Sequence, residues 1–148
     1  QSVVHNHSHA VIPFGVTPVP LRPVAHVGAS IGQELPIWDI RKKFGQTNLL
    51  VVNMEQGRDL AKELADNKVV LMRGHGCAVV GTSVEGAVMT SIYLQVNAQL
   101  LQDTLNMSSE VEYLSEQEIE LCAETFLSDF SIKRAWEYFQ RRAGAASF

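Results

Sequence analysis

The sequence predicts an α/β domain in which a layered sheet is covered by helices, and three observations support this fold class. Short apolar runs typical of buried strands occur at residues 1–5, 49–52, 69–72 and 77–81. Segments with helix-capping residues follow two of these runs, and three such segments succeed one another from Thr82 onward. Strands mixed with helices and then followed by helices favour a sheet with helices packed on it. At 148 residues, we expect a single domain over residues 1–148 with its own hydrophobic core.

The first half of the chain combines short strands with a long loop. The run QSVVH looks like the end of a buried strand, and all five prolines fall in residues 10–36. Proline cannot continue a helix, so this region is predicted to be an ordered loop with short extended pieces. A strand is expected at residues 49–52, after which Asn53 can cap a helix with an apolar stripe from Leu60 to Ala65. Further strands are expected at residues 69–72 and 77–81.

Three helices are predicted in the second half. Thr82 and Glu85 in T-S-V-E form a capping box, which opens a helix ending near residue 106. This helix is apolar on two faces, so we expect both faces to be buried, one of them in contacts with another subunit. A second capping box opens a helix over residues 115–127, and Ser131 is expected to cap the last helix.

Composition and charge exclude several classes of protein. The net charge of −4 and the lack of a basic block argue against nucleic-acid binding, and no apolar run is long enough to span a membrane. Two cysteines without a recognisable framework favour a reducing, cytoplasmic location. The chain begins with Gln1 rather than Met, and no strand or helix precedes the first histidines. We therefore expect that an N-terminal portion is missing from this chain.

The stretch VVHNHSHA places three of the five histidines within five residues. In a strand, residues two apart face the same way, so His5 and His7 would point to one spot. Two imidazoles placed in this way can bind one metal ion, although a lone H-x-H pair also arises by chance on surfaces. His9 is expected to turn away because the strand ends before it.

A further histidine lies between two glycines in RGHG, directly after the apolar run VVLM. Glycines permit backbone conformations and close approaches that other residues do not. His75 is therefore either a placed functional side chain or a histidine that hydrogen-bonds to backbone in a tight turn, and the residues alone favour neither. Cys77, which precedes apolar residues, is expected to be a small core residue rather than a ligand.

Together these motifs resemble the class II aldolase/adducin family. The matching segments are VVHNH at 3–7, VVLMRGHG at 69–76 and CAVVGTSVEGA at 77–87. The resemblance implies that His5, His7 and His75 bind a divalent metal ion. Imidazole accepts Zn, Mn, Fe and Co, among which we expect Zn or Mn. The resemblance to this family also implies a homotetramer with active sites near subunit boundaries.

Within that family the chain looks most like the branch that decarboxylates hydroxylated aromatic acids. The resemblance lies in VIPFGVTPVPLRPVAHVGASIG with its R-P-x-x-H element, in PIWDIR and in IKRAWEYF. It implies a metal-dependent lyase that acts on a small-molecule carboxylate. We expect His26 to protonate the carbon that loses carbon dioxide and Arg22 to pair with a substrate carboxylate. Each could instead be an ordinary loop residue.

Three other functions are compatible with parts of the pattern. A class II aldolase that cleaves a sugar phosphate would need a phosphate-binding Ser/Gly loop, and the family carries that loop and an acidic residue ahead of H-x-H. An adducin-like interaction module without catalysis predicts lost metal ligands, whereas all three histidines are present. A cupin also uses H-x-H but is all-β, which the capped helices oppose.

Overall fold

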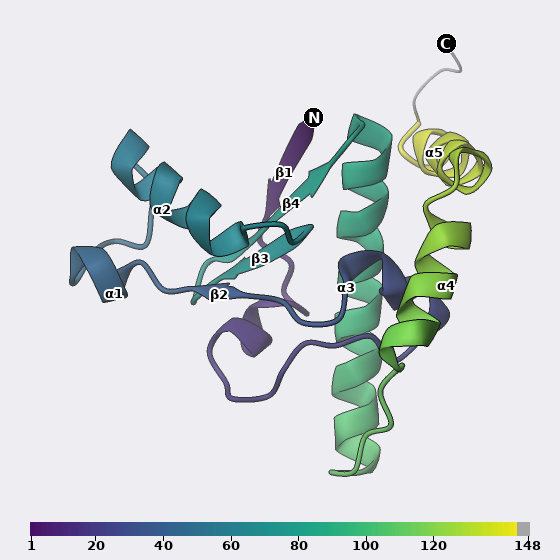
Figure 1. The fold of residues 1–148 in the computed structure, drawn as a ribbon, viewed down its shortest axis with the longest axis horizontal. Coiled ribbons are helices and arrows are strands. Elements are labelled where there is room, and N and C mark those ends of the chain that lie inside the picture. The colour runs from purple at the N-terminus through teal and green to yellow at the C-terminus, as the bar shows by residue number, and fades with distance from the viewer. Residues whose placement is uncertain (145–148) are drawn as a thin grey trace.

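The computed structural model describes residues 1–144, which contain a four-stranded mixed sheet with the strand order β1-β4-β3-β2 (Figure 1). The strands are β1 (Ser2–Asn6), β2 (Ile37–Trp38), β3 (Val69–Met72) and β4 (Gly76–Gly81). β4 pairs antiparallel with both β1 and β3, while β2 runs parallel to β3. The hairpin of β3 and β4 therefore forms the centre of the sheet.

Helices lie on both faces of this sheet (Figure 1). The α-helices are α1 (Arg41–Phe44), α2 (Met54–Leu64), α3 (Val84–Met107), α4 (Glu116–Phe126) and α5 (Asp129–Arg142), and the 3-10 helices are η1 (Ile12–Gly15) and η2 (His26–Ile31). Helix α3 packs against β1 and β4, α2 packs against β2 and β3, and η2 packs against α3 and α4. The predicted α/β fold class, a sheet covered by helices, is thus confirmed.

Two hydrophobic clusters follow from the alternation of side chains along β3 and β4. Val69 and Leu71 face the larger cluster, which includes Leu94 and Leu101 of α3. Val70 and its neighbours on the opposite face pack with Trp38, Leu60 and Leu64. A strand that is buried on both faces needs apolar residues at every position, which explains the unbroken run VVLM.

Two of the predicted helix caps are confirmed. The side chain of Asn53 accepts a hydrogen bond from the backbone N–H of Gln56 at 3.0 Å and caps α2. Ser115 and Glu118 form the complete capping box at the start of α4. These side chains satisfy backbone N–H groups that have no partner within the helix.

The other two helices are capped by residues other than those predicted. Helix α3 is capped by Ser83, whose Oγ accepts from the N–H of Gly86 at 3.0 Å, and not by Thr82. Helix α5 is capped by Ser128, and Ser131 lies within its first turn. Ser131 donates its backbone N–H to Ser128 Oγ, so it is the residue that is capped. Neighbouring hydroxyl residues made the sequence signal ambiguous by one to three positions.

The strand predicted at residues 49–52 is wrong, because this run is an irregular loop. Leu49 has a positive φ of 66°, which a strand does not allow. The N–H groups of Leu49 and Leu50 donate to the side chains of Thr47 and Asn48 rather than to a neighbouring strand. These local turns use the donors that a sheet would need.

The predicted second apolar face of α3 is partly open in this single chain. Val96 and Leu100 are 39% and 40% exposed. Subunit contacts through this face remain a prediction. Within residues 1–144, none of the helices combines the length and the apolar character needed to cross a membrane.

Candidate metal centre

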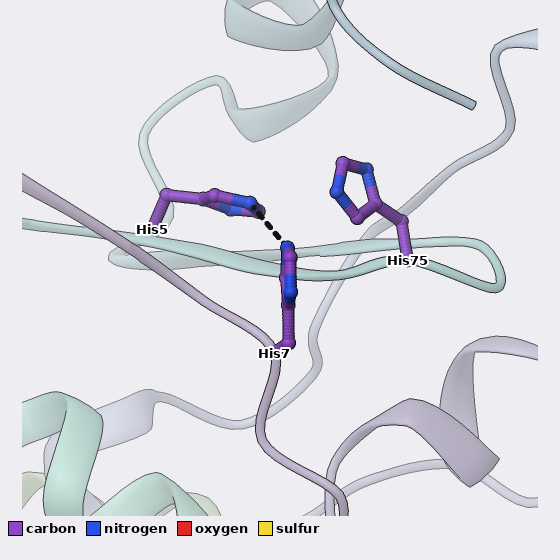
Figure 2. A group of neighbouring side chains, drawn as sticks. All are labelled: His5, His7 and His75. Carbon is purple, nitrogen blue, oxygen red and sulfur yellow. Dashed lines mark hydrogen bonds between the residues drawn. The ribbon is translucent and has the colours of Figure 1, made fainter. Parts of the chain in front are cut away.

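The pairing of β1 with β4 places the first two histidines of the site. His5 pairs with Ala78 in this register, and Asn6, the last residue of β1, pairs with Cys77. His7 follows directly after the strand. His5 and His7 extend from the same side of the chain, as expected for residues two apart (Figure 2). His7 also borders a hollow next to α3, together with Val4 and Asn6.

The third histidine comes from the turn between β3 and β4. The backbone N–H of His75 donates to the carbonyl of Met72 at 2.9 Å, and Gly74 has a φ of +68°, a conformation that favours glycine. Gly76 then begins β4 where β1 lies so close that a Cβ would collide with the carbonyl oxygen of Asn6. The backbone geometry thus explains both glycines of RGHG.

The structure brings His5, His7 and His75 together (Figure 2). The Nε2 atoms of His5 and His7 are 3.0 Å apart, and the ring centroids of the three residues are 4.8–5.0 Å from one another. One ligand atom from each residue can be chosen so that all lie within 4.8 Å of one another. Nitrogens that bind one ion at roughly 2.0–2.1 Å must approach each other in this way.

A backbone hydrogen bond orients the ring of His5. Its Nδ1 lies 2.9 Å from the carbonyl oxygen of Cys77. A carbonyl can only accept, so Nδ1 carries the proton and the Nε2 of neutral His5 presents a lone pair to the other two rings. This is the arrangement by which metal-binding histidines are commonly held.

The ring of His75 is held in its neutral form. Burial lowers its pKa below the ordinary value, and the nearby rings of His5 and His7 lower it further when they are charged. Its Nδ1 is buried without a hydrogen bond. The donor set therefore fits a divalent transition metal, because three convergent imidazoles bind in the neutral form and leave open coordination positions for a substrate.

Acid is expected to release metal from this centre. Protons compete with the ion for the imidazole nitrogens, so metal retention should fall below about pH 6.5, the ordinary pKa of histidine. The lowered pKa of His75 shifts the loss of this ligand toward lower pH. Metal content after dialysis at a series of pH values measures this, and retention that is unchanged down to about pH 4 would contradict it.

Two neighbouring residues lie outside the cluster, as expected. His9 is exposed and is not among the residues that converge. Cys77 is fully buried, and burial raises the pKa of its thiol to about 11. A thiol with this pKa stays protonated at neutral pH, so Cys77 contributes its carbonyl and its packing rather than a thiolate.

His26 and Arg22 are not among the residues of the three-histidine cluster. His26 is exposed at the start of η2, with its ring centroid 6.2 Å from that of Phe126 in α4. The guanidinium of Arg22 stacks 4.5 Å from the ring centroid of Tyr113, and its Nε is buried without a hydrogen bond. Both side chains therefore contact the α3–α4 side of the domain.

Sequence reasoning missed Asn97, a fully buried residue of α3. Its amide donates to the carbonyl of Arg22 at 2.9 Å and accepts from the N–H of Val24 at 3.0 Å. It thereby fixes the R-P-x-x-H loop to α3, and Gly28 leaves the room that its side chain fills. The signal was present, since Asn97 lies one turn after Leu94 on the buried face of the helix.

The fold is that of the class II aldolases. The structure matches an aldolase II superfamily protein from Pseudomonas syringae with a TM-score of 0.72 and 19% identity, covering 95% of this chain and 54% of that one. It matches an L-fuculose 1-phosphate aldolase from Glaciozyma antarctica with a TM-score of 0.69 and 18% identity, covering 97% and 53%. At these identities the likeness shows the fold alone.

The chain belongs to the class II aldolase and adducin family, because residues 1–102 match the family model described as the Class II Aldolase and Adducin N-terminal domain. It is similar to decarboxylase tropJ from Talaromyces stipitatus, with 32% identity over 162 residues, covering 95% of this chain and 60% of that protein. It is also similar to a 3,4-dihydroxyphthalate decarboxylase from Arthrobacter keyseri, with 25% identity over 146 residues, covering 99% and 58%. The chain thus spans about 60% of the length of these relatives.

Proposed function

We propose that this protein is a metal-dependent carbon–carbon lyase that decarboxylates a hydroxylated aromatic or heteroaromatic acid. The observation that carries the proposal is the convergence of His5, His7 and His75 in a chain whose curated relatives are named as decarboxylases. The ion is proposed to be Zn or Mn, bound by the three imidazoles.

Loss of carbon dioxide leaves an electron pair on carbon, and the site must stabilise this negative charge. A divalent ion supplies a Lewis acid that stabilises negative charge on a neighbouring substrate oxygen. The residues of this chain supply the rest of the site. Cys77 orients His5 through its carbonyl, and burial keeps His75 neutral. Two of the residues that would hold the ion are thus prepared before substrate arrives, because the ring of His5 is oriented and that of His75 is kept neutral.

The proton donor and the carboxylate partner are proposed to act across a subunit boundary. Since His26 and Arg22 contact the α3–α4 side of their own chain, they would serve the histidine cluster of a neighbouring copy in a homotetramer. His26 would then protonate the carbon, and Arg22 would pair with a second carboxylate. The two free cysteines are consistent with the proposed cytoplasmic location.

A second candidate is an aldolase that cleaves a sugar phosphate, because several structures with this fold are named L-fuculose 1-phosphate aldolase. Aldol cleavage also leaves an electron pair on carbon, so the same three histidines would serve either reaction. The two functions differ in their substrates and products. An adducin-like module without catalysis is disfavoured by the presence of all three histidines.

The deciding experiment compares carbon dioxide release from dihydroxyphthalate-like acids with retro-aldol release of a triose phosphate or glycolaldehyde from sugar phosphates. The protein is assayed after reconstitution with Zn or Mn and again after chelation. Metal-dependent release of carbon dioxide is the expected result. Release of retro-aldol products alone would favour the aldolase over the decarboxylase. If the metal-loaded protein reacted with neither class of substrate, a lyase function for this chain would be refuted.

A further inference from the structure

The segment PIWDIR at residues 36–41 lies beside the strand that leads to His75, although it supplies none of the three histidines. Ile37 and Trp38 form β2, which pairs in parallel with the end of β3 (Figure 1). The carbonyl of Trp38 accepts from the N–H of Arg73, the residue directly after β3, at 3.0 Å. PIWDIR therefore holds the backbone of the β3–β4 turn at its first residue.

Asp39 adds a charged contact to the same residue. Its Oδ1 lies 3.1 Å from Nε of Arg73, and the side chains of Asp39 and Arg73 are only 14% and 26% exposed, respectively. The contact is an ion pair rather than an aligned hydrogen bond, because this Nε–H has no acceptor in hydrogen-bond geometry within the described residues. A pair that is partly shielded from water is screened less than an exposed one. Arg73 is thus fixed to the β2 side of the sheet through both its backbone and its side chain.

The carboxylate of Asp39 is itself held in place from two sides. Its oxygens accept from the backbone N–H of Arg41 at 3.1 Å and from Nη2 of Arg41 at 2.7 Å. The preceding Trp38 is 3% exposed and donates its indole N–H to Asp59 of α2 at 2.9 Å. Arg41 and, to a lesser extent, Arg73 hold the pKa of Asp39 well below its usual range, so the carboxylate is charged at neutral pH.

A single glycine separates Arg73 from His75. Gly74 has a φ of +68°, and the N–H of His75 donates back to the carbonyl of Met72 at 2.9 Å. In so tight a turn, any shift of Arg73 also shifts His75. The strand order β1-β4-β3-β2 places Asp39 at the opposite edge of the sheet from β1, which carries His5. The hairpin that carries His75 is therefore held between these two edges.

We propose that Asp39 and Arg73 are positioning residues of the metal centre, which hold the β3–β4 turn so that the ring of His75 meets the other two rings of the cluster. The inference rests on the proposed metal centre and deepens it, since it gives PIWDIR a role in placing one of the ligands. Asp39 is not among the residues that converge on the site, so it acts through Arg73.

Three single substitutions test this pair. Arg73→Met removes the positive charge and keeps an unbranched side chain, and Asp39→Asn removes the negative charge with almost no change of shape. Arg73→Lys is the conservative variant, because an ammonium group can still pair with Asp39. If the two residues act as one unit, the double variant Asp39→Asn/Arg73→Met should bind metal no more weakly than either single variant does.

Two control variants separate positioning from other effects. Arg41→Met removes the other guanidinium that pairs with Asp39, and Arg41 lies outside the β3–β4 turn. Asn53→Ala removes the side chain that caps α2, so it lowers thermal stability without removing a contact of Arg73.

Each variant is measured for Co²⁺ affinity, for the visible absorption spectrum of bound Co²⁺ and for thermal stability, and hydrogen exchange at the backbone N–H of His75 is followed in the metal-free proteins. Arg73→Met and Asp39→Asn should weaken Co²⁺ binding by about tenfold or more, as loss of a residue that orients a ligand does. Both should also change the Co²⁺ spectrum and speed the exchange of the His75 N–H, because the turn is no longer fixed. Arg73→Lys, Arg41→Met and Asn53→Ala should keep Co²⁺ affinity within about threefold of that of the parent protein.

The proposal is overturned if Arg73→Met binds Co²⁺ within about threefold of the parent protein, or if Co²⁺ affinity falls in step with thermal stability across all variants, Asn53→Ala included. Failure of the metal centre itself looks different, because the unsubstituted protein would then bind no Co²⁺. In that case, faster exchange of the His75 N–H in metal-free Arg73→Met and Asp39→Asn would still support the role of the pair in holding the turn, and unchanged exchange would overturn it.

Discussion

Replacing His75 with alanine is expected to abolish stable metal binding and to reduce any lyase activity by more than about a hundredfold, since even residues that only orient a ligand contribute 10–100-fold. His75 is the sole contribution of the β3–β4 turn to the three-histidine cluster. Without it, two imidazoles remain on one short segment of chain, and the ion loses the ligand that links β1 to the hairpin. Elemental analysis after dialysis should give about one transition metal per chain in the parent protein and almost none in the variant.

His9→Ala is the matched control for this experiment. His9 belongs to the same segment as His5 and His7, is exposed, and lies outside the cluster, so its loss should leave the metal content unchanged. Equal loss of metal in both variants would point to nonspecific surface binding. Full retention of metal by His75→Ala would remove the basis for the proposed lyase.

The convergence of the histidines could be predicted because strand geometry controls it. Residues two apart on an extended chain share a side, and His7 follows directly after β1. The apolar run ahead of RGHG identified a buried strand that leads to His75 at the end of the sheet. The residues alone did not decide whether His75 is a metal ligand or only a histidine within a tight turn. The pairing of Asn6 with Cys77 across β1 and β4, a contact between distant parts of the chain, brings the rings together.

The loop of residues 49–52 could not be predicted because its run of apolar residues is also typical of a buried strand. Its conformation depends on hydrogen bonds that its backbone N–H groups donate to the side chains of Thr47 and Asn48, and on packing next to the distant Gly74. Similarly, the R-P-x-x-H motif indicated functional side chains, but its position depends on Asn97, 75 residues further along the chain than Arg22. In both cases a tertiary contact decides what a local pattern leaves open.

Gly76→Ala is expected to lower both the stability of the domain and its affinity for metal. A Cβ at this position would collide with the carbonyl oxygen of Asn6 and would lie 3.1 Å from Cδ2 of His7. The backbones of β1 and β4 would have to separate where Asn6 pairs with Cys77, at the end of the strand that carries His5. Overpacking of this kind costs about 1–3 kcal/mol of unfolding free energy. Because His7 moves with β1, we expect metal affinity to fall by at least about tenfold.

Gly57→Ala in helix α2 provides the control, because a Cβ there meets nothing within 4 Å. Alanine is the better helix former, so this variant should be more stable by about 0.5–1 kcal/mol and should bind metal normally. Urea denaturation of the metal-free proteins gives the stabilities, and titration with Zn²⁺ against a chelator gives the affinities. If Gly76→Ala lost stability yet bound Zn²⁺ as tightly as the parent protein, the spacing of β1 and β4 would not control the position of His7. Loss of both properties in Gly76→Ala alone would mean that the close contact of these two strands is a requirement of the metal centre as well as of the fold.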